Sequence, residues 1–408
     1  MNNNLQIALD NDGKSIWKFL ISELKPKGKF LTPFNVISIP IIIIGLGLII
    51  LRFWKGIGEV SNVTQDIPWG LWKGFNVVTG VAFAGGAYVL TFMVYILNMR
   101  KYRSIIRVTV LNGFLAYAFY AGALVLDLGR PWHIFNPIIG NSFGASSVLF
   151  LVAWHFLLYM IAQLIEFSPA IAEWLGIRRA HRILSGMTMA AVIFGITLSM
   201  LHQSGLGALF LMAKEKIHPL WYSEFIPVLF LVSSIFAGLS MVIFEGSISH
   251  KVFFDQISEK NKNAQNGIIR GLSKICAGTM FAYFFLQLLV FVHKQRWDML
   301  DTALGHWFLL EMLGFVLLPM ILFFVSYRKN NIAMIKTAAI LTILGVILNR
   351  LNVSIISFRW DMAVRYVPSW MEVVVALAVI FSQIWIFRWV INRMPVLRDS
   401  PSWANEHN

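Results

Sequence analysis

Seven ionisable side chains lie within or at the edges of strongly apolar stretches of the sequence. They are Asp127, His155, Glu166, His202, Glu245, His293 and Glu311. At the centre of a membrane span such a residue costs roughly 2.5–3.5 kcal/mol on insertion scales, so those that persist usually face a cavity or a partner. Carboxylates and imidazoles are also the groups that most often accept and release protons in reactions. These positions are therefore the first candidates for chemistry.

Asp127 and Arg130 stand three residues apart at the end of one apolar stretch. If a helix continues that far, the two side chains share one of its faces. One interpretation is a self-neutralising pair that fixes the helix end at the membrane surface. The other is a carboxylate that Arg130 keeps ionised and that accepts a proton when a bound quinol is oxidised. Both interpretations remain open at the level of the sequence.

His202 closes another apolar stretch and is followed by Gln203, Ser204 and Gly205. We expect a polar turn of small residues there, in which a flat ring can approach the backbone. A quinone needs donors for its carbonyl oxygens and an apolar slot for its ring and tail. His202 and Asp127 together would supply a donor and a proton acceptor. Against this, a single interfacial histidine is more often an ordinary hydrogen-bonded residue.

Tyr117 and Tyr120 lie one helical turn apart in the third predicted span, and Asn76 starts a stripe of small residues in the second. Helix packing explains these patterns equally well. A proton path would join Tyr117 through water to His155, which lies in mid-membrane, and to Glu245 at the far end of the sixth span. Nothing in the spacing requires these residues to meet, and Glu245 could equally lie at headgroup depth.

The sequence contains one cysteine, Cys276, which we interpret as a packing residue. An iron–sulfur cluster needs about four thiolates, and a structural zinc site needs several closely spaced Cys or His. A bis-histidine haem needs two histidines on facing helices at matching depth, whereas only His155 is clearly deep. We therefore expect neither haem, nor an iron–sulfur cluster, nor another metal site in this chain.

The composition predicts an all-α, polytopic membrane protein. Of 408 residues, 58% are hydrophobic and only 13% are charged, whereas soluble domains carry about 25% charged residues. A spanning helix needs about 20 apolar residues. We expect about ten such helices, at residues 33–51, 72–98, 106–126, 147–166, 183–201, 226–245, 268–292, 307–326, 332–350 and 371–391. Residues 1–32 and 392–408 would flank this membrane domain, 33–391.

The net charge of +14 is interpreted as a topology signal and as attraction to anionic lipid headgroups, not as nucleic-acid binding. The termini and even-numbered loops carry about 23 Lys or Arg, and the odd-numbered loops about 11. The positive-inside rule then places both termini in the cytoplasm. The expected location is the bacterial cytoplasmic membrane, with the polar, aromatic-rich loops on the periplasmic side.

Several short stretches, in order along the chain, resemble one family. The chain is similar to the ten-helix, cytochrome-b-like (HybB-type) membrane subunit of nickel–iron hydrogenases, in the polysulfide-reductase or NrfD-like superfamily. The matching stretches are Pro68-Trp69-Gly70-Leu71-Trp72, Asp127-Leu128-Gly129-Arg130, His202-Gln203-Ser204, His218-Pro219-Leu220-Trp221, Val242-Ile243-Phe244-Glu245-Gly246-Ser247 and Pro368-Ser369-Trp370-Met371-Glu372. Each is weak alone, but the ordered set is fairly specific.

The resemblance implies a haem-free, quinone-binding helical bundle that acts as the membrane subunit of a hydrogen:quinone oxidoreductase. Menaquinone or ubiquinone would bind near the outer face. The implied partners are an iron–sulfur electron-transfer subunit and the large and small subunits of a periplasmic nickel–iron hydrogenase. By match to the family's motifs, the resemblance carries over Arg107, Tyr117, His202 and Glu245, with Asp127 and Arg130. Together with the residue patterns described above, we expect catalytic roles for Asp127, His202 and Tyr117. We expect quinone contacts from Trp69, Asn76, Tyr120, Arg130 and Gln203, and a proton path through Arg107, His155 and Glu245.

One departure from the family bears on proton translocation. The family often has a Glu in the fourth helix after a Ser-Val-Leu-Phe stretch, whereas Leu151 follows Phe150 here. His155 lies one turn further along the same face, and it would either replace that Glu or leave the path incomplete. Two other functions stay open: a secondary transporter, in which binding groups gather at mid-membrane, and a purely structural anchor.

Overall fold

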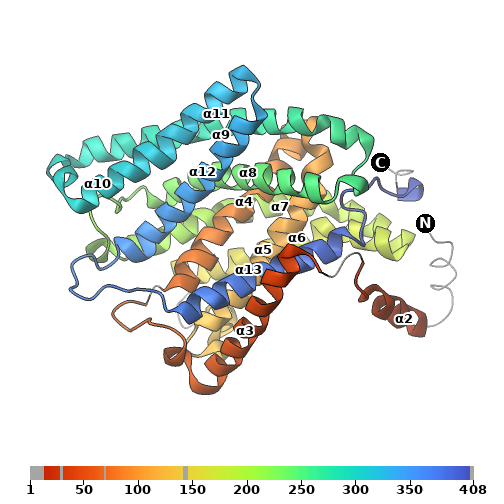
Figure 1. Cartoon of the computed structure of the whole chain (residues 1–408), viewed down its shortest axis with the longest axis horizontal. Coiled ribbons are helices and arrows are strands. Elements are labelled where there is room, and N and C mark those ends of the chain that lie inside the picture. The colour runs from red at the N-terminus through yellow and green to blue at the C-terminus, as the bar shows by residue number, and fades with distance from the viewer. Residues whose placement is uncertain (1–12, 28–30, 69, 141–145, 405–408) are drawn as a thin grey trace.

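The computed structural model describes residues 13–27, 31–68, 70–140 and 146–404, and these are predominantly helical (Figure 1). Within the described residues, ten helices are long and apolar enough to cross a membrane. This confirms the predicted all-α, polytopic membrane fold. The ten spans are α3 (Pro33–Lys55), η2–α4–η3 (Trp72–Ile96), η4–α5 (Arg100–Asp127), α6 (Val148–Leu175), α7 (Arg178–Leu211), α8 (Ile226–Val252), α9 (Glu259–Lys294), α10–η10–α11 (Ala303–Lys329), α12–η11 (Ile332–Ile356) and α13 (Trp370–Ile391).

Several spans change helix type along their length. The pieces are η2 (Trp72–Thr79), α4 (Gly80–Thr91), η3 (Phe92–Ile96), η4 (Arg100–Ile105), α5 (Ile106–Asp127), α10 (Ala303–Leu309), η10 (Leu310–Leu317), α11 (Leu318–Lys329), α12 (Ile332–Leu351) and η11 (Asn352–Ile356). η2, η3, η10 and η11 are π-helical, and π-bulges are frequent at functional sites. η2 contains Asn76, one of the predicted site residues.

The fourth and fifth spans are longer than the sequence predicts. α6 continues nine residues beyond the predicted end at 166, to Leu175, and α7 runs ten residues beyond 201, to Leu211. Their extra turns carry polar residues that are buried against other helices, such as Glu173 and Gln203, so apolarity alone does not mark the helix ends. The expected polar turn after His202 is therefore wrong, because those residues are helical.

The helices are arranged around the central pair α4 and α8 (Figure 1). α5 and α7 pack on α4, and α6 packs on both α5 and α7. α9 and α12 pack on α8, and α11 joins them. α3 and α13 form a pair that contacts α5 at one edge, while α9 and α11 lie at the opposite edge (Figure 1).

The two membrane faces are named here by what lies on them. The terminal face carries the short helix α2 (Gly13–Glu23) and residues 392–404, which are joined by an ion pair between Arg393 and Glu23 at 3.3 Å. The loop face is the opposite one, where α5 ends at Asp127 and α13 begins at Trp370.

Glycines allow α4 and α8 to approach backbone to backbone. A Cβ atom on Gly86 would lie 2.7 Å from the Gly238 carbonyl oxygen, and one on Gly85 would lie 2.8 Å from the Ser234 carbonyl oxygen. Such close approach through small residues is how helices associate within lipid, where burial of apolar side chains gives no advantage. The small-residue stripe of the second span is thus explained by packing at Gly85 and Gly86.

This contact makes a stability prediction. The change Gly238→Ala forces a methyl group into the α4 backbone, and we expect a loss of about 1–3 kcal/mol of stability, the usual cost of overpacking. The measurement is the thermal unfolding midpoint in detergent. Gly278→Ala in α9 is the matched control, because a Cβ atom there would have nothing from another element within 4 Å. Equal losses in both variants would contradict the proposed close contact.

Candidate functional site

Asp127 ends α5 at the loop face, as predicted, but its ion-pair partner is not Arg130. The carboxylate is 4% exposed and lies 2.7 Å from the Lys73 ammonium group. The guanidinium of Arg52 also lies close enough to attract it. The predicted pair with Arg130 is wrong, because the chain becomes extended at Leu128 and carries Arg130 to an exposed position.

Arg52 and Lys73 were not recognised from the sequence. Arg52 reaches from α3 and donates to the Leu126 carbonyl oxygen at 2.7 Å and to that of Leu128, so it holds the end of α5 that carries Asp127. Lys73 also donates to the Pro68 carbonyl oxygen at 2.9 Å. Lys73 directly follows the family-like stretch Pro68-Trp69-Gly70-Leu71-Trp72, and this adjacency is the feature of the sequence that could have identified it. Trp69, in the same stretch, lies outside the described residues.

Glu372 ties the start of α13 to the segment that precedes η2. Its carboxylate accepts from the Tyr366 hydroxyl at 2.5 Å and from the Ser369 and Asn62 backbone N–H groups at 2.9 and 3.1 Å. Burial and the hydrogen bond to Glu372 raise the pKa of Tyr366. Trp72 donates its indole N–H to the Glu372 carbonyl oxygen at 2.9 Å. These contacts fix the direction in which η2 enters the membrane.

A cavity of about 340 Å³ lies between η2–α4, α5, α8, α12 and α13. Most of its wall is apolar. The side chains that carry polar groups are Asn76, Thr79, Asn112, Tyr120, Glu245, Ser249 and Gln383. The structure therefore brings together three residues predicted separately from the sequence, Asn76, Tyr120 and Glu245. We call this space the central cavity.

Asn76 differs from most buried polar residues. Its side chain is 1% exposed, and neither the amide nitrogen nor the amide oxygen has a hydrogen-bond partner within the described part of the protein. An unpaired buried amide costs about 1–3 kcal/mol, and most such groups in folded proteins are paired with protein or water. A group that lines a cavity in this state is placed to donate to and accept from a ligand.

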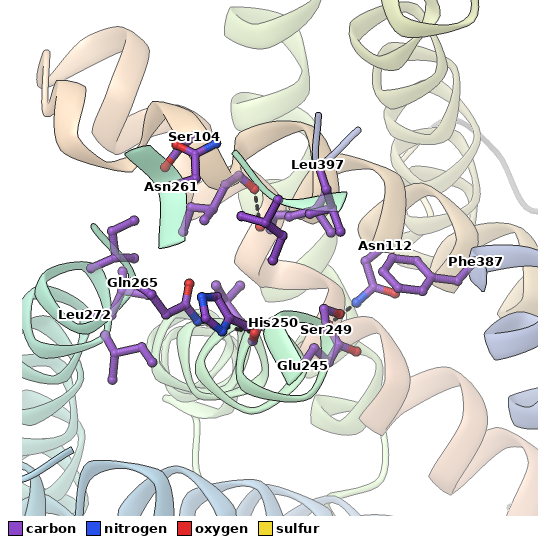
Figure 2. A pocket seen from close by; sticks show the side chains of 18 residues that line it. Ser104, Asn112, Glu245, Ser249, His250, Asn261, Gln265, Leu272, Phe387 and Leu397 are labelled. Carbon is purple, nitrogen blue, oxygen red and sulfur yellow. Dashed lines mark hydrogen bonds between the residues drawn. The ribbon is translucent and has the colours of Figure 1, made fainter. Parts of the chain in front are cut away.

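Glu245 lies between the central cavity and a second, smaller pocket of about 70 Å³. Both pockets are lined by Asn112, Glu245, Ser249 and Phe387. Asn112 donates its amide N–H to the Glu245 carboxylate. The smaller pocket carries further polar side chains from Ser104, Thr109, His250, Asn261 and Gln265 (Figure 2). We call it the inlet, because it lies on the terminal-face side of Glu245.

His202 lies away from the central cavity, in the group formed by α5, α6 and α7. It is nine residues before the end of α7, about 13 Å along a helix axis. Its ring packs against those of Tyr117 and Phe156, at centroid distances of 5.7 and 5.4 Å. Nδ1 is 3.2 Å from the Val152 carbonyl oxygen, while Nε2 is buried and has no partner among the described residues.

Tyr117 and Tyr120 face different sides of α5. Tyr117 is fully buried against Tyr159, with ring centroids 4.8 Å apart, whereas Tyr120 lines the central cavity. His155 lies on α6 directly before Phe156, whose ring packs against that of His202. Gln203 donates its amide N–H to the Val81 carbonyl oxygen at 2.8 Å, which links α7 to α4. Tyr117, His155 and His202 thus form one cluster that is distinct from the central cavity.

Arg107 holds a carboxylate near the terminal face, although this is not Glu245. Its guanidinium donates to both oxygens of Glu173, at 2.6 and 2.8 Å. Nε2 of His181 lies 3.1 Å from the same carboxylate. Glu173 is 2% exposed. The sequence missed it because it follows the predicted end of the fourth span.

Glu311 is a buried carboxylate of η10 that accepts hydrogen bonds from three side chains. It accepts from the Trp221 indole at 2.7 Å and from the Asn349 and Asn352 amides at 2.6 and 2.5 Å. Arg350 donates to the Asn349 amide oxygen at 2.8 Å. A buried carboxylate whose two oxygens are both hydrogen-bonded fixes one arrangement of the surrounding elements. We interpret Glu311 as a residue that holds η10, α12, η11 and the segment before α8 together.

His155 and His202 do not present the arrangement of a bis-histidine haem. His155 and His202 lie on α6 and α7, which pack directly against each other. A Cβ on Gly195 of α7 would be 3.5 Å from the Ala162 Cβ of α6, and a porphyrin does not fit between helices at that separation. The absence of haem stays a prediction, and the isolated subunit should show no reduced-minus-oxidised b-type spectrum. A stoichiometric b-type band would overturn it.

The ion pair at the loop face makes a second stability prediction. Lys73→Met leaves Asp127 buried without its nearest cation, and we expect a loss of about 3 kcal/mol, as for other broken buried pairs. Adding Asp127→Asn should restore much of that loss, because the uncompensated charge is then gone. Thermal unfolding of both single variants and the double variant gives the coupling energy. Strictly additive losses would show that the two residues do not interact.

The fold and these sites define a multi-pass integral membrane protein with a cavity between its helices. Residues 59–358 match the family model described as polysulphide reductase, NrfD, and the chain belongs to this family. It is 41% identical to a protein of Nitratidesulfovibrio vulgaris over 92% of this chain and 97% of that one.

Two further relatives have descriptive names. The chain is 27% identical to the probable Ni/Fe-hydrogenase 2 b-type cytochrome subunit of Escherichia coli, over 93% of this chain and 96% of that one. It is 25% identical to the integral membrane subunit of menaquinone reductase from Nitratidesulfovibrio vulgaris, over 78% of this chain and 80% of that one. The family resemblance noted in the sequence is thereby confirmed.

Proposed function

We propose that this chain is the quinone-reactive membrane subunit of a respiratory oxidoreductase. It would accept electrons from a periplasmic nickel–iron hydrogenase through an iron–sulfur subunit and pass them to menaquinone or ubiquinone. Membership of the NrfD family supports this function, as do the names of the hydrogenase and menaquinone reductase relatives. The chain would not be active alone, because it would depend on its partners for electrons.

The observation that carries the proposal is the unpaired amide of Asn76 in the wall of the central cavity. A quinone headgroup is flat and apolar, with carbonyl oxygens that need donors. The cavity supplies apolar walls of a size ordinary for ligand sites. The Asn76 N–H group would donate to one carbonyl oxygen, and Tyr120 would lie beside the ring. This position lies deeper in the bundle than the loop-face site expected from Asp127 and His202.

Reduction of the quinone consumes two electrons and two protons for each quinol formed. Glu245 lines the same cavity and also the inlet, so it is placed to deliver protons from the terminal face. Tyr117 and His155 lie in the separate cluster with His202, and their part in a proton path stays a prediction, as does that of Arg107. Translocation of protons across the membrane is a further hypothesis that rests on Glu245.

The proposed orientation places the terminal face in the cytoplasm and the loop face in the periplasm, from the charge bias of the loops. The iron–sulfur subunit and the hydrogenase would then dock on the loop face, on the side where Asp127, Arg130 and Lys73 lie. Other NrfD-type complexes would use the same cavity with a different catalytic module. The hydrogenase relative, which matches nearly the full length of both chains, favours a hydrogenase partner.

The quinone site is tested by the change Asn76→Leu in the assembled complex. Loss of one hydrogen bond to the substrate should slow quinone reduction by roughly tenfold, which corresponds to about 1.4 kcal/mol. Hydrogen oxidation with an artificial acceptor that bypasses the quinone should be unchanged. The matched control is Asn266→Leu, an exposed position of α9 toward the terminal face, which should leave both activities unchanged.

The competing site is tested in the same assay with His202→Ala and Asp127→Asn. The central-cavity account predicts that these variants keep more quinone activity than Asn76→Leu. If Asn76→Leu retains the parental rate while His202→Ala loses it, the quinone binds in the α5–α7 group and the assignment of the central cavity is wrong.

The proton-delivery role is tested by Glu245→Gln. The substitution keeps the hydrogen bond to Asn112 possible but removes the ionisable proton, so quinone reduction should slow. The complex in proteoliposomes should then generate no membrane potential. Glu259→Gln, on the exposed start of α9 with a nearby Lys262, is the control. Full turnover with an unchanged potential would mean that Glu245 is not in the path.

A further inference from the structure

The chain continues beyond α13 as a segment of turns and bends, residues 392–404, that lies along the terminal face. Only its last residues, η12 (Ser402–Ala404), are helical. Arg393 fastens its beginning to α2 and the residues after it, donating to the Glu23 and Lys25 carbonyl oxygens at 2.5 and 2.7 Å. We call residues 392–404 the C-terminal strap.

The middle of the strap is held by the membrane domain itself. Met394, Pro395 and Val396 are buried. The Pro395 carbonyl oxygen accepts from Arg107 at 3.1 Å, and Arg107 is the residue that also holds Glu173. The exposed Arg398 donates to the Gln256 amide oxygen at 3.2 Å, beyond the end of α8.

At the far end of the strap, Ala404 is buried and Trp403 contacts α7. Trp403 lies edge-on to the His181 ring at a centroid distance of 5.4 Å, and the Arg178 guanidinium lies over the indole at 5.6 Å. Both partners are in the first turns of α7. Between Arg398 and Trp403 the strap has little regular secondary structure, so the position of its far end depends on these contacts.

Leu397 lies between Arg393 and Trp403, which anchor the two ends of the strap, and it forms part of the wall of the inlet. Figure 2 shows Leu397 on the side of the pocket where Ser104 and Asn261 lie, with Glu245 and Ser249 on the opposite side. The strap therefore contributes an apolar side chain to the part of the inlet that is nearest the terminal face, beside the polar side chains of Ser104 and Asn261.

We propose that the C-terminal strap is a movable cover of the inlet. With Trp403 seated on α7, Leu397 narrows the aqueous path toward Glu245. Release of Trp403 leaves the segment after Val396 held by the exposed Arg398 through its hydrogen bond to Gln256, and the movement that this allows widens the path while the ten spans keep their packing. Segments with little secondary structure and few anchoring contacts open at low free-energy cost. The strap would thus regulate how readily water and small ions reach the inlet.

The test is the chemical accessibility of a cysteine inside the inlet. Cys276, which is fully buried, is replaced by Ala, and Ser249→Cys is introduced in the wall of the inlet. A small charged methanethiosulfonate reagent is then applied to the detergent-solubilised complex, and the rate of modification is measured. Adding Trp403→Ala should raise this rate by roughly tenfold or more, because the far end of the strap is no longer held.

Two controls and a second variant keep the test decisive. Trp297→Ala, an exposed tryptophan outside the strap, should leave the rate unchanged, and Lys329→Cys at the end of α11 should react equally in all backgrounds. Leu397→Ala keeps the contacts of Arg393 and Trp403 but removes the covering side chain. It should also raise the rate at which the cysteine introduced by Ser249→Cys is modified. Unchanged rates in either strap variant would overturn the proposal. The result does not depend on proton delivery by Glu245, whose failure would appear in turnover and not in labelling.

Discussion

The contact between α4 and α8 determines the geometry of the other elements. Because Gly85, Gly86 and Gly238 have no side chains, the two helices meet at their backbones. This close approach places η2, which is continuous with α4, beside α12, and it directs Glu245 of α8 toward α5. The central cavity is the space left where α5, α12 and α13 cannot close around this pair. A single methyl group added where α4 and α8 cross would therefore displace the walls of the central cavity as well as lower the stability of the fold.

Polar groups inside the membrane domain fall into two kinds. Asp127 with Lys73, Glu173 with Arg107, and Glu311 with its ring of donors are matched pairs or networks. Such groups are costly in lipid unless paired, and each of these fastens two or more helices together. Asn76 is buried just as completely, yet its amide has no partner among the described residues and lines a space large enough for a ligand. This contrast is why we propose a quinone site at Asn76 and interpret the carboxylates of Asp127, Glu173 and Glu311 as structural.

The sequence predicted the number of spans and most of their boundaries, because apolar length is a strong signal in a membrane protein. It identified Asn76, Tyr120 and Glu245, which the structure brings into one cavity. It failed where tertiary contacts override local pattern. Arg130 is exposed because the helix ends at Asp127, and Asp127 pairs instead with Lys73 of the second span. The turn after His202 is helical because Gln203 finds its partner on α4. No spacing rule could have indicated either contact, or the inlet that α5, α8, α9 and the strap form together.

The most direct test of the account is an electron cryomicroscopy map of the assembled complex with a tightly bound quinone analogue. We expect density for the ring in the central cavity, with one of its oxygens within hydrogen-bond distance of the Asn76 amide and with the ring beside Tyr120. Ring density next to His202 and Tyr117, with the central cavity filled only by lipid, would contradict the central claim.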